Sequence, residues 1–273
     1  MLLLMTLIAA PVLWVAGYSL LYSLGAVGRF RCGWTTAHWI QAFSSLQIGV
    51  SLLYSATISV VVVGLGTIVS LGLSVLLIGH RHQRRVIFAL SVPMATPVAV
   101  TAMMVYQVFN PGGLLARIAY WFGWIQSSSE FPVLVNDAWS IGIVVAGLFS
   151  IVPLLTVFFL RTWTSAKIDR FVYVAAGLGA KRWQSLLRIA VPMLMRRSRS
   201  MLLLLLLIQF GSFEVPLLLG RQSPQMISVL TQRRFGQYDL MHRPEAFVVS
   251  STCMVVVGAG VILLQKLRQN DER

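Results

Sequence analysis

The chain has 273 residues, of which 57% are hydrophobic and only 11% are charged, and its mean hydropathy is +0.80. Soluble domains carry about 25% charged residues, so this composition excludes a water-soluble globule, and its apolar content excludes a disordered chain. The net charge of +14, from 22 basic and 8 acidic residues, fits basic helix ends that meet anionic lipid better than it fits nucleic-acid binding. Composition therefore predicts a membrane protein of several helices.

Apolar runs of membrane-spanning length recur along the chain. A spanning helix needs about 20 apolar residues. Six windows reach that length and predict an all-α bundle of six transmembrane helices, at 2–24, 48–79, 86–109, 138–160, 200–220 and 245–265. The first window lacks the basic start and the small-residue cleavage site of a signal peptide, so we expect it to be retained as a helix. With no linker or internal repeat, 1–273 is predicted to form a single transmembrane domain.

The basic residues predict how this bundle is oriented. If the N-terminus lies in the cytoplasm, 15 of the 22 lysine and arginine residues fall on the cytoplasmic side, nine of them between Arg161 and Arg199. Lysine and arginine accumulate in cytoplasmic loops of membrane proteins. We therefore expect both termini, and the loop 161–199 between the fourth and fifth windows, to face the cytoplasm.

The loop 161–199 holds the most informative pattern. Residues before Gly179 suit one short helix, and residues after it suit a second whose apolar face is formed by Trp183, Leu186 and Leu187. Gly179 can supply the turn between them, because glycine tolerates a positive φ. The loop is thus predicted to form a helix–turn–helix.

This pattern resembles the EAA loop, the cytoplasmic signature of ABC importer permeases. Leu178-Gly179-Ala180 matches the core of that signature. Ile189 follows Gly179 by ten residues and Pro192 follows it by thirteen, which is the family spacing. Pro192 can also begin the fifth helix, since proline is tolerated in a first turn.

The loop departs from the family at its start. Tyr173 stands in place of the family's glutamate and Val174 in place of its first alanine, which removes any salt bridge of that glutamate but keeps the helix–turn–helix. The resemblance implies that the loop couples the chain to an ATPase. The residues that it assigns to this coupling are Tyr173, Val174, Ala175, Ala176, Leu178, Gly179, Ala180, Trp183, Ile189 and Pro192.

Two further stretches are similar to one branch of these permeases, the polyamine, ferric-iron and thiamine permeases. Pro93 and Pro97, followed by Asn110-Pro-Gly-Gly113, are similar to the paired-proline helix of that branch. The stretch 210–220 is similar to its Phe-Gly-acidic-Phe pattern, with the acid displaced to Glu214. The resemblance extends from about residue 50 to 265.

The resemblance implies a type I ABC importer permease bundle with a cytoplasmic coupling helix, in the bacterial inner membrane. It also implies a second permease subunit, identical or homologous, two cytoplasmic ATPase subunits and an extracytoplasmic solute-binding protein. ATP and Mg²⁺ would bind the partner ATPases, because this sequence has no phosphate-binding Gly-x4-Gly-Lys-Ser/Thr loop and is not an enzyme by itself. We expect no cofactor or metal on the chain, since its four histidines are scattered.

Glu214 is the one acidic residue well within a predicted helix. A charge in the bilayer costs at least ~2.5–3.5 kcal/mol. The carboxylate therefore either faces the translocation path or lies near the helix end, paired with an arginine such as Arg221 or at the headgroups. Gln209, Ser212 and Gln107 are candidates for the same path, although a glutamine in a bundle is more often a partner of a neighbouring helix.

Two other classes of protein remain as alternatives. An ATP-independent secondary transporter or channel would be expected to show coupling-ion carboxylates or inverted repeats, and neither is obvious here. A membrane scaffold would use 169–192 as an adaptor-binding site. Within the importer hypothesis, Glu214 favours a cationic substrate such as a polyamine, but the sequence does not exclude iron or thiamine as the substrate.

Overall fold

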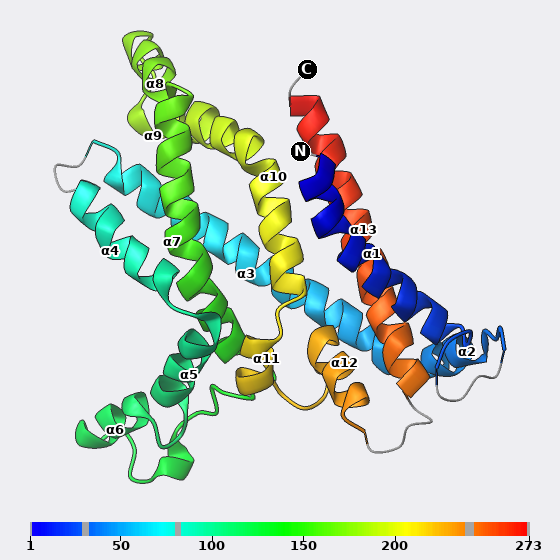
Figure 1. Cartoon of the computed structure of the whole chain (residues 1–273). Helices are drawn as coiled ribbons and strands as arrows, with labels where there is room; N and C mark the ends of the chain where they lie inside the picture. Colours follow the sequence, from blue (N-terminus) through cyan, green and yellow to red (C-terminus); the bar gives the residue numbers. More distant parts are fainter. Residues whose placement is uncertain (1, 29–32, 80–82, 238–242, 272–273) are drawn as a thin grey trace. The chain divides into compact units, whose positions relative to one another are not determined.

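The computed structural model describes residues 2–28, 33–79, 83–237 and 243–271, and the regular elements in these ranges are all helices (Figure 1). The prediction of an all-α protein is confirmed. Helices suit this composition because they satisfy their backbone hydrogen bonds internally, as a hydrocarbon environment requires. The chain divides into two compact units, Met1–Thr57 with Gln222–Ile262 and Ile58–Arg221 with Leu263–Arg273.

The first unit is built on an antiparallel helix pair. Ser19 and Ser251 share a hydroxyl hydrogen bond of 3.1 Å, and Tyr22 stacks on Phe247 with ring centroids 4.1 Å apart. Phe235 packs edge-on against the same Phe247 ring, which brings a third helix to the pair. The unit comprises α1 (Leu2–Ser23), α2 (Ala37–Ser44), the first part of α3 (Gln47–Leu77), α12 (Ile227–Phe235) and most of α13 (Arg243–Asp271).

The second unit is centred on α7 (Ile141–Ser165), whose Ile143, Leu155 and Phe159 side chains are fully buried. The rest of α3 lies against α7, since the Ser70 hydroxyl donates to the Val152 carbonyl at 3.0 Å. Gly147 allows this approach, because a Cβ there would lie only 2.5 Å from Val62. The remaining elements are α4 (Gln83–Ala95), α5 (Val98–Phe109), α6 (Leu114–Trp121), η1 (Ser128–Glu130), α8 (Ile168–Gly177), α9 (Arg182–Ser185), η2 (Leu186–Ala190), α10 (Val191–Phe210) and α11 (Glu214–Leu219).

Within the described residues, four stretches are long and apolar enough to cross a membrane. They are Gln47–Leu77, Val98–Trp121, Ile141–Ser165 and Arg243–Lys266. The predicted count of six spans is therefore not confirmed.

The third predicted window, 86–109, is divided. α4 ends at Ala95 and α5 begins at Val98, with Pro97 in extended backbone between them. Proline disfavours helical backbone in the residue before it, so a single helix does not continue through Thr96.

The fifth predicted window, 200–220, is also divided, which corrects the expectation for Glu214. α10 ends at Phe210, and Glu214 is the exposed first residue of the short helix α11 rather than a residue well within a long helix. The reason is Pro216, because its ring would clash with the carbonyl of Ser212 in a continuous helix. Glu214 lies in the first turn of α11, where the helix dipole favours a carboxylate.

Candidate coupling hairpin and solute path

The loop 161–199 contains the predicted helix–turn–helix, with α8 and α9 as its two limbs (Figure 1). Gly179 has a φ of +86° and forms the turn. Its N–H donates to the Ala176 carbonyl at 3.0 Å, and the Ala180 N–H donates to the Ala175 carbonyl at 3.0 Å. This pair of hydrogen bonds defines a Schellman cap, in which glycine favours the left-handed position after a helix. The prediction of the turn at Gly179 is confirmed.

The α8–α9 hairpin presents apolar side chains to its surroundings. Tyr173 is 81% exposed and Leu178 is 85% exposed. We call the exposed set the hairpin apolar surface; it consists of Phe171, Tyr173, Val174, Leu178, Trp183 and Leu187. Ile168 and Ala175 are buried and anchor the other side of α8. An exposed apolar surface of this kind marks a site of interaction with a protein or a membrane.

The other residues assigned to coupling take several positions. Ala176, Gly179 and Pro192 are exposed, whereas Ala180 and Ile189 are half-buried. On the second limb, Leu186 is half-buried while Trp183 and Leu187 are exposed, so the predicted apolar face is only partly covered.

The second limb of the hairpin continues into α10 without a break. Between α9 and α10 lies a π-helical turn, η2, in which the Val191 N–H donates to the Leu186 carbonyl. Pro192 follows this turn in the first two positions of α10. Because proline has no N–H and its ring would clash with the Arg188 carbonyl in a regular α-turn, the wider π-turn lets the helix pass the proline. The chain is thus helical from Arg182 to Phe210.

The charged residues of this region are exposed around the hairpin. Lys167, Arg170, Lys181, Arg182 and Arg188 are all exposed, and these residues give the segment a basic surface. Asp169 lies in the first turn of α8, where the helix dipole favours a carboxylate. This charge pattern fits a surface next to anionic lipid headgroups.

The four residues predicted for the solute path are not brought together in the cavity that Gln107 lines. Gln107 is exposed and lines a cavity of about 460 Å³ at the turn between α5 and α6, and none of the other three residues lines this cavity. Gln209 is buried on α10 beside Gly147 of α7, and its amide nitrogen has no hydrogen-bond partner among the described residues. Ser212 and Glu214 lie at the break between α10 and α11.

A polar group that the sequence analysis missed lies along one face of α3. Ser51, Ser55 and Ser59 of α3 are all buried, and their spacing of four residues is a helical signal that predicts a hydrogen-bonding face. Ser51 lines a second cavity, of about 310 Å³. Across the described ranges, no group of three or more histidine, cysteine, aspartate or glutamate side chains could hold a metal ion.

No protein-family model matches the sequence, and no curated protein matches it. Solved structures do share its fold. A chain of a bacterial ABC transporter involved in the import of the acidic polysaccharide alginate has a TM-score of 0.73 and 17% sequence identity, over 98% of this chain and 95% of that chain. A bacterial alginate ABC transporter in complex with alginate pentasaccharide-bound periplasmic protein has a TM-score of 0.70 at 17% identity, over 98% and 94%.

The chain therefore has the fold of an ABC importer permease along nearly its whole length. This likeness agrees with the family that the loop resembles. It does not confirm the polyamine, ferric-iron and thiamine branch.

Proposed function

We propose that this chain is the membrane-spanning permease subunit of an ATP-driven ABC importer. The observation that carries the proposal is the α8–α9 hairpin, which holds large apolar side chains outside the fold on a turn fixed by Gly179. The likeness of fold to subunits of alginate importers supports it. Apolar side chains held in this way gain free energy when a partner covers them.

The partner that we propose for the hairpin is a cytoplasmic ATPase. Tyr173, Val174 and Leu178 would supply apolar contact, while the small residues Ala176 and Gly179 let the partner approach the backbone. ATP and Mg²⁺ bind to the ATPase subunits, which carry out the hydrolysis. The permease chain holds no cofactor in this proposal.

The continuous helix gives this docking a mechanical consequence. When the ATPase pair closes, it displaces the hairpin. Because Arg182–Phe210 is helical throughout, the displacement reaches the break at 211–213 and the start of α11. A break between two helices can act as a hinge, so that a small displacement of one helix changes the angle between the two. Glu214 and Ser212 lie at this point, and we propose that they contribute to the path of the solute.

The complete transporter that we propose contains a second permease subunit, two ATPase subunits and a solute-binding protein. The second of the alginate transporter structures includes a periplasmic protein bound to an alginate pentasaccharide. We place this chain in the bacterial inner membrane with both termini and the basic hairpin in the cytoplasm, in accord with the positive-inside rule.

Co-purification tests the proposal directly. The tagged chain is purified in mild detergent from the membranes in which it is naturally made, and the proteins that accompany it are identified. Val174→Arg places a charge on the hairpin apolar surface, and Val133→Arg is the matched control, because Val174 and Val133 are 61% and 62% exposed. We expect an ATPase to accompany the wild-type chain and Val133→Arg but not Val174→Arg.

The opposite result would favour a different class of protein. If the chain purifies alone under conditions that preserve known membrane complexes, the hairpin does not bind an ATPase. The ATP-independent transporter or channel would then become the better hypothesis.

A further inference from the structure

The cavity of about 310 Å³ in the first unit lies between the start of α3 and the segment 222–225. Its polar lining consists of Gln47 and Ser51 from α3 and Gln222, Ser223 and Gln225 from the segment. None of the side chains lining the cavity among the described residues is charged. The cavity thus offers amide and hydroxyl groups without an ionic partner.

Two of these polar groups are buried and unpaired. Ser51 is 1% exposed and Gln225 is 5% exposed. The Ser51 hydroxyl and the Gln225 amide nitrogen have no hydrogen-bond partner among the described residues. Such a group costs about 1–3 kcal/mol, and buried polar groups in folded proteins are normally paired. One group comes from each wall of the cavity, and both atoms are shielded from water in this structure. A molecule in the cavity would bond both once these two side chains turn toward it.

The two walls are fixed to each other close to these groups. Ser55, one helical turn after Ser51, accepts a hydrogen bond of 2.8 Å from the Ile227 N–H and donates one of 2.8 Å to the Ser51 carbonyl. Met226 and Ile227, which follow Gln225, are fully buried. This anchoring holds the segment 222–225 in place beside α3, and the cavity is therefore part of the fold.

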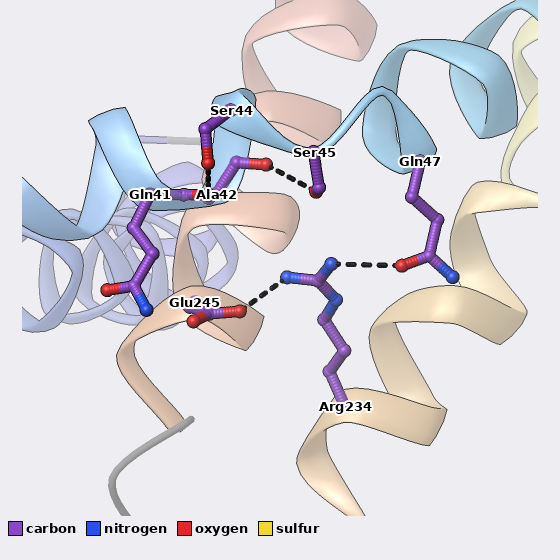
Figure 2. Close-up of polar contacts among 7 residues, drawn as sticks. All are labelled: Gln41, Ala42, Ser44, Ser45, Gln47, Arg234 and Glu245. Carbon is purple, nitrogen blue, oxygen red and sulfur yellow. Dashed lines mark hydrogen bonds and ion pairs between the residues drawn. The ribbon is translucent and has the colours of Figure 1, made fainter.

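The orientation of Gln47 is set by an arginine outside the lining (Figure 2). Arg234 donates to the Gln47 amide oxygen at 3.2 Å and forms an ion pair of 2.8 Å with Glu245. Because a guanidinium only donates hydrogen bonds, the accepting atom must be the oxygen, and the Gln47 amide nitrogen remains a donor. Glu245 balances the charge of Arg234, so the charge next to the cavity is neutralised.

We propose that this cavity binds an uncharged polyhydroxyl compound, a neutral sugar unit or a polyol. Hydroxyl groups both donate and accept, which matches amide nitrogens and a serine hydroxyl. A charged solute would lose hydration there without gaining an opposite charge. The volume is at the small end of ligand pockets, about 300–1,000 Å³, and far exceeds the ~30 Å³ share of one water molecule. Leu46 and Val50 add apolar contact for the C–H face of a sugar ring.

Galactose and galacturonate are suitable probes, because they share a ring and differ in a carboxylate. Binding of each, and of spermidine, is measured by titration calorimetry on the full chain in lipid nanodiscs. We expect galactose to bind at least ~10-fold more tightly than galacturonate or spermidine. Gln225→Leu and Ser51→Ala should each weaken galactose binding at least ~10-fold, whereas the exposed controls Gln232→Leu and Ser44→Ala should not.

A stability measurement separates ligand recognition from folding. Because the Ser51 hydroxyl and the Gln225 amide nitrogen lack partners among the described residues, replacing them by apolar groups should leave the melting temperature of the ligand-free chain unchanged or higher. A clear fall in that temperature in both variants would show that the groups are already paired and would overturn the proposal. So would unchanged galactose binding by Gln225→Leu, tighter binding of a charged probe, or no galactose binding by folded protein. None of these results bears on whether an ATPase binds the hairpin.

Discussion

The α8–α9 hairpin and the cavity beside α3 differ in opposite ways from the usual pattern of buried apolar and paired polar side chains. The hairpin leaves apolar side chains uncovered, while the cavity leaves polar side chains buried without partners. Apolar burial is non-directional and scales with area, so the hairpin is suited to a broad protein surface. Hydrogen bonds are directional, so the cavity specifies the chemistry of a small ligand. The kind of unmet interaction therefore indicates the kind of partner.

The largest effect that we expect comes from the turn of the hairpin. Gly179→Pro forces φ to about −65° where the turn needs +86°, and it removes the N–H that bonds the Ala176 carbonyl. The docking surface should be remodelled, and ATP hydrolysis should lose its coupling to transport. Hydrolysis and uptake are measured together in reconstituted vesicles, with Gly177→Ala as the control. Normal coupling in Gly179→Pro would count against the assignment of the loop.

The next effect concerns Arg234, which bonds Gln47 at the wall of the cavity. Arg234→Met removes the ion pair with Glu245, whose side chain is only 15% exposed, and releases the Gln47 amide. We expect a loss of about 1–3 kcal/mol in the free energy of unfolding, seen as a lower melting temperature. Arg233→Met, on an exposed neighbour, should change stability by less than about 0.5 kcal/mol. Equal effects of the two substitutions would show that the ion pair does not support this unit.

A smaller effect is expected where the helix from the hairpin ends. Glu214→Gln keeps the shape of the side chain but removes its charge, and transport at limiting solute should fall several-fold while the complex still assembles. Glu130→Gln, on an exposed carboxylate of η1, serves as the control. Full transport by Glu214→Gln would remove this residue from the mechanism.

The smallest effect concerns the base of the hairpin. Lys167 joins α7 to α8 with a φ of +51°, a left-handed conformation that costs a non-glycine residue roughly 1 kcal/mol. Lys167→Gly relieves that strain, although glycine also raises the entropy of the unfolded chain. We expect the melting temperature to change by only a few degrees and ATPase co-purification to persist. Loss of the ATPase in this variant would indicate that the backbone at Lys167, and not only the hairpin apolar surface, positions the docking.

The features that could be predicted from the sequence are local ones. The turn at Gly179 follows from a glycine between two helix-forming segments, and the cap is completed by backbone groups within a few residues. The break before Glu214 could also have been predicted, because Pro216 acts on a carbonyl four residues earlier. It was missed because the apolar character of 200–220 continues through the break. Hydropathy measures composition and does not register a change in backbone direction.

The sequence by itself determined that the chain is helical, apolar enough for a membrane and equipped with a Gly179 turn, because composition and short-range sterics decide these properties. Only the tertiary structure decided which side chains are left without partners. Ser51 and Gln225 lie far apart in the sequence. They line the same cavity because Ser55 anchors the start of α12. The exposure of Tyr173 and Leu178 likewise depends on what packs around α8. Burial depends on long-range contacts, which local residue patterns do not encode.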